Sequence, residues 1–137
     1  LGSAMLIKKS DFKDLGMFDE NFFLFFSDDD LCRKVKNKKK SIIQSIHAKA
    51  IHEHGQSKVK NKLKKVFLRN YHYTSDELYY HYKLNRNTLN YKKLKKKIFN
   101  YKIKMMLNLI TLRLEKSVFY LSKILAFNKF SKFIEKK

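Results

Sequence analysis

Three consecutive carboxylates, Asp28–Asp30, form the part of this chain best suited to acid–base chemistry. They follow an aromatic segment, since five phenylalanines lie among residues 18–26. An aromatic segment favours burial, and burial raises the pKa of a carboxylate, which is what a general base needs. The same carboxylates would also stabilise the start of a helix, where they face unpaired N–H groups. Both interpretations stay open for each residue of the run.

This acidic run belongs to a series of four blocks, Gly2–Lys9, Gly16–Phe23, Ser27–Lys34 and Ile51–Ser57. In content and order, the blocks resemble the second half of the catalytic domain of family-2 glycosyltransferases, especially the rhamnosyltransferase-like branch. One position departs from the family pattern, because Ser27 stands where the family usually has Glu. Any electrostatic effect of that Glu on the neighbouring carboxylate would be lost here.

The resemblance implies a reaction and a set of roles. A sugar would pass, with inversion, from a nucleotide-diphosphate donor to a hydroxyl of a cell-surface glycan or lipid-linked acceptor. Asp28 matches the position of the catalytic base, while Asp30, Asp19 and Glu20 would contact the acceptor. His52 matches a histidine that often binds the divalent cation, Mg²⁺ or Mn²⁺, that neutralises the leaving diphosphate. An imidazole ligand favours Mn²⁺ over Mg²⁺.

The resemblance also implies a fold class and two domains. Residues 1–57 would be the closing portion of an α/β GT-A nucleotide-diphospho-sugar transferase domain, and residues 58–137 a helical, basic, amphipathic extension. The nucleotide-binding βαβ units of such a domain would belong to its first half. We therefore expect the isolated chain to be inactive.

Local sequence patterns predict strands in the first part and helices in the second. Gly16 suits a helix C-cap, where a positive φ is needed. Ser75 is a plausible N-cap of a later helix. The expected elements are strands at 4–8, 42–46 and 50–54, helices at 10–15 and 29–38, and helices from about residue 60 onward with breaks near Thr74 and 85–90.

Positive charge is concentrated in the second part of the chain. Residues 1–57 contain 10 Lys/Arg and 8 Asp/Glu, a net charge of +2, whereas residues 58–137 contain 22 and 4, a net charge of +18. Apolar residues recur there at steps of three and four, which predicts one amphipathic helix or two helices in line. This stripe consists of Ile103, Met106, Leu107, Ile110, Leu114, Val118, Leu121 and Leu125.

Three interpretations of the basic part remain. Peripheral contact with an anionic membrane comes first, because basic amphipathic helices bind such surfaces. General lysine enrichment, typical of an AT-rich genome, comes second, and nucleic-acid binding third. The apolar stripe could equally pack on another part of the protein. We expect a cytoplasmic protein at the inner face of the plasma membrane, or alternatively a non-catalytic basic module or decayed transferase remnant.

Overall fold

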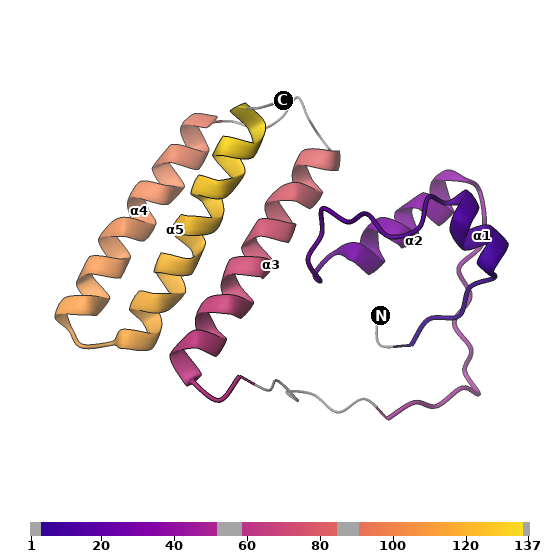
Figure 1. Cartoon of the computed structure of the whole chain (residues 1–137), viewed down its shortest axis with the longest axis horizontal. Coiled ribbons are helices and arrows are strands. Elements are labelled where there is room, and N and C mark those ends of the chain that lie inside the picture. The colour runs from indigo at the N-terminus through magenta and orange to yellow at the C-terminus, as the bar shows by residue number, and fades with distance from the viewer. Residues whose placement is uncertain (1–3, 52–58, 85–90, 136–137) are drawn as a thin grey trace. The chain divides into compact units, whose positions relative to one another are not determined.

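The computed structural model describes residues 4–51, 59–84 and 91–135. The chain divides into two compact units, Leu1–Gln56 (unit 1) and Ser57–Lys137 (unit 2). Helices α1 (Lys9–Asp14) and α2 (Ser27–Asn37) belong to unit 1. Unit 2 contains α3 (Lys62–Leu84), α4 (Tyr91–Ile110) and α5 (Leu114–Glu135), as Figure 1 shows.

Unit 1 has a small apolar core, and its first helix ends as the sequence predicts. Leu15, Phe22 and Leu31 are buried. Gly16 has a φ of 73°, and its N–H donates to the carbonyl oxygen of Lys13 at 2.9 Å. The following N–H donates to Phe12 O at 2.9 Å, which completes a Schellman motif.

The predicted α/β fold is wrong, because the described residues form helices and contain no strand. The segments 4–8 and 42–46, and the described part of 50–54, are irregular and almost entirely exposed; residues 52–54 lie outside the described part of the chain. A strand is stabilised by hydrogen bonds and side-chain contacts with a neighbouring strand. Within residues 4–51 these segments have no such neighbour, so their apolar residues do not assemble into a sheet.

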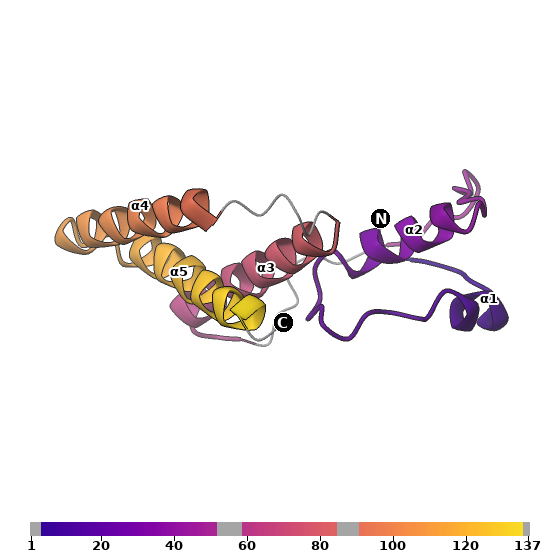
Figure 2. The ribbon, with the colours of Figure 1, turned by 90° about the horizontal axis from the view of Figure 1, so that it is seen from above.

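Helix α5 lies in the middle of unit 2 and packs against both α3 and α4 (Figures 1 and 2). Ile124, Ala126, Phe127 and Phe130 of α5 are buried. A helix with neighbours on two sides must bury apolar residues over more of its circumference than a simple amphipathic helix does. This position explains why the core of unit 2 is built mainly from α5.

Aromatic side chains fill the two helix–helix contacts. On the α3 side, Tyr82 contacts Phe130 with ring centres 6.0 Å apart. On the α4 side, the centre of the Tyr101 ring lies 5.7 Å from that of Tyr120 and 6.0 Å from that of Phe127. Such aromatic pairs add stability beyond that of the apolar area they bury.

The predicted helix break near Thr74 is wrong, as is the N-cap at Ser75, because α3 continues through both residues. Thr74 is 1% exposed, so tertiary packing overrides the low helix propensity of this segment. The predicted break at 85–90 lies outside the described residues.

The apolar stripe of the second part does not form one line, because a tight turn separates α4 from α5. Leu112 has a φ of 54°, and its N–H donates to Leu109 O at 3.0 Å. The Arg113 N–H donates to Asn108 O at 2.8 Å. These two hydrogen bonds form a second Schellman motif, with leucine at the position that usually holds glycine. The two helices therefore lie side by side and antiparallel (Figure 1).

No helix in the described part of the chain is both long and apolar enough to cross a bilayer.

Candidate functional site

The three carboxylates lie in the first turn of α2. Phe26, just before this turn, has a left-handed φ of 62°, and the Ser27 hydroxyl donates to Leu24 O at 2.9 Å. Successive residues of a helix point about 100° apart, so the three carboxylates face different surroundings. Asp28 is half-buried, Asp29 is exposed, and Asp30 is 1% exposed.

Asp30 connects α2 to the segment that follows α1. Its Oδ2 lies 3.6 Å from Nζ of Lys34, one helical turn later. The same ammonium group donates to the carbonyl oxygen of Met17 at 2.8 Å. This arrangement fixes the first turn of α2 while Asp28 stays partly accessible. The predicted contact of Asp30 with an acceptor stays a prediction, and its carboxylate would have to be uncovered first.

The other predicted acceptor contacts, Asp19 and Glu20, lie in the loop before α2. Asp19 is half-buried, and its Oδ1 accepts hydrogen bonds from the backbone N–H of Asn21 at 3.0 Å and from its side-chain amide at 2.7 Å. Glu20 is exposed. Of the aromatic residues around them, Phe22 is buried, whereas Phe23 is 67% exposed. The aromatic segment is therefore only partly buried, although its composition favours burial.

The described residues do not form a metal site. No three His, Cys, Asp or Glu side chains of residues 4–51, 59–84 and 91–135 lie together as a cation would require. The predicted ligand His52 lies outside these ranges. The predicted divalent cation, Mg²⁺ or Mn²⁺, therefore stays a prediction.

A second candidate surface lies on α4. The side chains that face α5 recur at helical spacing and are half-buried. They are Leu94, Ile98, Tyr101, Met105 and Asn108. The opposite side of α4 is also apolar, although it is exposed to solvent. This outer face of α4 consists of Phe99, Ile103, Met106, Leu107 and Ile110, which are 45–73% exposed.

Lysines border the outer face of α4 on both sides. From the 100° turn per residue, Lys95 and Lys102 lie along one border, and Lys93 and Lys104 along the other. Lys96 lies within the face at its N-terminal end. Helix α4 contains no Asp or Glu. The combination of an apolar face and positive borders is typical of helices that lie on anionic membranes.

Some cations of unit 2 contact aromatic rings. Nζ of Lys97 lies 5.5 Å from the centre of the Phe127 ring, and Nζ of Lys123 lies 4.7 Å from that of Phe119. Burial lowers the pKa of Lys123, and burial likewise raises the pKa of Tyr101. The Lys97–Phe127 contact joins α4 to α5, whereas the Lys123–Phe119 contact lies within α5, so both lysines contribute to the packing of this unit.

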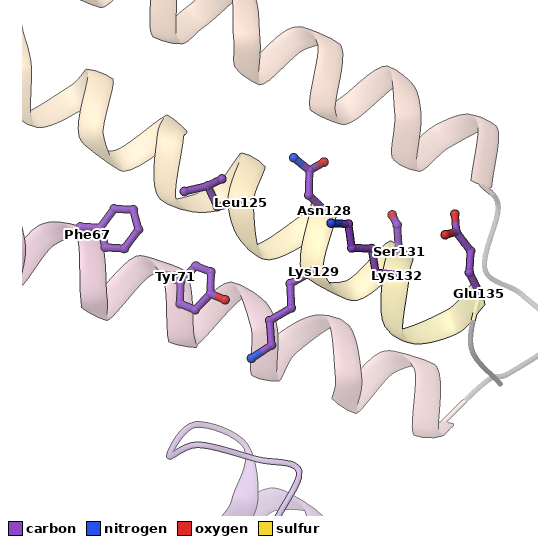
Figure 3. A pocket seen from close by; sticks show the side chains of 8 residues that line it. All are labelled: Phe67, Tyr71, Leu125, Asn128, Lys129, Ser131, Lys132 and Glu135. Atoms are coloured by element: carbon purple, nitrogen blue, oxygen red, sulfur yellow. The ribbon is translucent and has the colours of Figure 1, made fainter.

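An open groove of about 870 Å³ runs along α3 and α5 (Figure 3). Phe67 and Tyr71 line it from α3, and Leu125 and Lys129 are among the α5 residues that line it. Nζ of Lys129 lies 5.8 Å from the centre of the Tyr71 ring. The groove is wide open to solvent, and its lining gathers no set of groups suited to catalysis.

The apolar repeat in the sequence predicted part of the outer face, but it also included residues that belong to α5. Ile103, Met106, Leu107 and Ile110 belong to both the predicted stripe and this face, but Phe99 was missed. The sequence does contain a signal for two apolar faces, because α4 has a second apolar repeat at 94, 98, 101 and 105. A helix with two apolar faces can pack with one and leave the other exposed.

No known protein family, curated protein or solved structure matches this chain. The predicted relationship to the family-2 glycosyltransferases and their GT-A fold is therefore wrong, on this result and on the helical architecture of the described residues.

Proposed function

We propose that this protein is a peripheral membrane protein whose unit 2 binds anionic lipid surfaces. The observation that carries the proposal is the α4 surface, where lysines border an exposed apolar face on a helix without acidic residues. Each Lys or Arg near an anionic membrane contributes about 1 kcal/mol of attraction. The few lysines along α4 would therefore suffice for measurable binding. We assign this contact to the inner face of the plasma membrane, on the cytoplasmic side.

Nucleic acid is the competing ligand for a basic surface, because its phosphates attract the same lysines. Single-stranded nucleic acid also requires exposed aromatic rings on which bases stack. In unit 2, aromatic residues such as Tyr82, Tyr101 and Phe130 contact other rings. The outer face of α4 carries a single aromatic residue, Phe99, among aliphatic ones. This composition favours lipid over bases.

Co-sedimentation of the full chain with lipid vesicles tests this proposal. We expect binding to vesicles that contain phosphatidylglycerol and little binding to pure phosphatidylcholine. Equal or absent binding to both would contradict it. An oligonucleotide of matched phosphate concentration serves as the competitor. Preferential binding to the oligonucleotide would identify nucleic acid, and not a membrane, as the partner.

Sugar transfer is a second candidate function, and the position of Asp28 favours it. This carboxylate is partly accessible, and the Asp30–Lys34 pair anchors the helical turn that carries it. Asp28 would take the proton of an acceptor hydroxyl as its oxygen forms a bond to the anomeric carbon of the sugar. The bond from that carbon to the nucleotide diphosphate would break, and the diphosphate would leave with the electron pair. Membrane-bound, lipid-linked acceptors would suit such an enzyme.

The Asp28→Asn variant tests this second candidate in the protein isolated from its native cells. If Asp28 is the base, sugar transfer from a nucleotide-diphosphate donor should fall by orders of magnitude. The exposed Asp29 provides the matched control, since Asp29→Asn makes the same change on the next residue. If the unmodified protein transfers sugar and Asp28→Asn transfers it equally fast, Asp28 is not the base.

A further inference from the structure

We infer that α4 lies parallel to the membrane surface, with its outer face inserted among the lipid acyl chains. The inference rests on the proposed function and names the surface that makes the contact. Phe99, Ile103 and Ile110 lie on one side of the helix and are 63%, 45% and 73% exposed. Exposed apolar faces of this kind mark interaction sites.

The lysine borders identify lipid as the occupant of this face. Lys95 and Lys102 on one side, with Lys93 and Lys104 on the other, lie where the polar side of an interfacial helix meets the headgroups. Long lysine side chains extend their charged ends toward phosphate while their methylene groups remain in apolar surroundings. Lys96, within the face, would do the same from the N-terminal end of the helix.

A second copy of the chain fits this face less well. If two α4 helices packed through their outer faces, the lysine borders of one would lie close to those of the other. Neither helix has an acidic residue to pair with them. Like charges brought together in this way destabilise an interface. Anionic headgroups, in contrast, complement both borders.

The apolar surface continues past the end of α4 into the turn. Leu112, in the turn, and Leu114, the first residue of α5, are 83% and 50% exposed, and Leu109, near the end of α4, is 48% exposed. Leu112 occupies the left-handed position of the turn, where glycine is usual and leucine is strained. An exposed leucine at a position that disfavours it is consistent with a function for the side chain itself.

Replacing two isoleucines of the outer face tests the inference. In the Ile103→Gln/Ile110→Gln variant, glutamine preserves helix propensity and charge but removes the apolar side chains. We expect binding to anionic vesicles to weaken about tenfold or more, and the binding that persists at high salt to disappear. Ile43→Gln/Ile46→Gln is the matched control, because these isoleucines are 87% and 82% exposed outside any helix. The control should bind as the unmodified chain does.

The outcomes separate this inference from the proposed function. If the unmodified chain binds anionic vesicles and Ile103→Gln/Ile110→Gln binds with the same affinity and salt dependence, α4 insertion is wrong although membrane binding stands. If the unmodified chain does not bind, the proposed function itself fails. Sedimentation equilibrium of both proteins detects the remaining alternative, because a dimer that the variant dissociates would identify a second copy as the occupant. Circular dichroism confirms that the helices are retained.

Discussion

Leu112 adopts a backbone conformation that is unfavourable for leucine. Its φ of 54° is a conformation that costs an ordinary L-residue roughly 1–2 kcal/mol and glycine almost nothing. The neighbouring backbone hydrogen bonds, from Leu112 N–H to Leu109 O and from Arg113 N–H to Asn108 O, hold the turn despite this cost.

We therefore predict that Leu112→Gly stabilises the protein by about 1 kcal/mol, because it relieves the left-handed strain. Urea unfolding followed by circular dichroism measures the change. Leu107→Gly is the control within α4, where glycine should destabilise by about 1 kcal/mol. A loss of stability in Leu112→Gly would show that the side chain contributes more to the fold than its 83% exposure suggests.

At the scale of the helices, α3 contains a group whose protonation is linked to folding. Burial lowers the pKa of His72 below the ordinary histidine value of 6.5, against a smaller opposite effect of Asp76. Between the lowered pKa and 6.5, the unfolded chain binds more protons at this site than the folded one. The contribution of His72 to stability is therefore full above pH 6.5 and declines as the pH falls through this window.

We predict that the free energy of unfolding of the full chain decreases on acidification from pH 7 to pH 5, and that His72→Gln reduces this decrease. Denaturant titrations at a series of pH values measure it. Identical pH profiles for His72→Gln and the unmodified protein would show that His72 does not contribute to the loss of stability on acidification.

Helix α5 carries the packing of unit 2, which gives a prediction about its core. Phe127 is 2% exposed and contacts Tyr101 of α4. Phe127→Ala should destabilise the protein by about 3–5 kcal/mol, because it leaves a cavity at the α4–α5 contact. Leu121→Ala, at a side chain that is 38% exposed, should cost much less. Similar unfolding midpoints for the two variants would contradict the central position of α5.

The helices of unit 1 were predictable because their signals are local. Gly16 ends α1 as expected, and the acidic run begins α2 at Ser27, two residues before the predicted start. The strands were not predictable from apolar residues alone, since a strand also requires a partner, and residues 4–51 supply none. The turn at Leu112 was missed for a different reason, because leucine is not a turn residue and gives no local signal.

The candidate sites, like the fold, were predictable only where the signal is local. The carboxylates Asp28–Asp30 were found from residue type, but their separation into accessible and buried groups depends on which side of α2 packs. The sequence alone does not show which apolar face of α4 is exposed, because this depends on α5 covering the opposite side. Patterns in sequence identify apolar faces, and packing decides which face remains exposed.

In the whole molecule, the two units differ in net charge and in the groups that they expose. Unit 1 is nearly neutral, with a net charge of +2 over residues 1–57, and pairs its buried Asp30 carboxylate with Lys34. Residues 58–137 carry +18 and the apolar outer face of α4. Strong positive charge promotes association with anionic surfaces irrespective of fold. In the membrane contact that we propose, the apolar face would add an interaction that salt does not screen.

The most direct test is the depth of α4 in a bilayer. A fluorophore attached through Leu107→Cys, in a Cys32→Ser background, reports from the outer face, and one attached through Asn128→Cys reports from an exposed position of α5. With anionic vesicles that carry a quencher on their acyl chains, the label at residue 107 should be strongly quenched and that at residue 128 only weakly. Equal quenching at both positions, or none at residue 107, would contradict the insertion of α4.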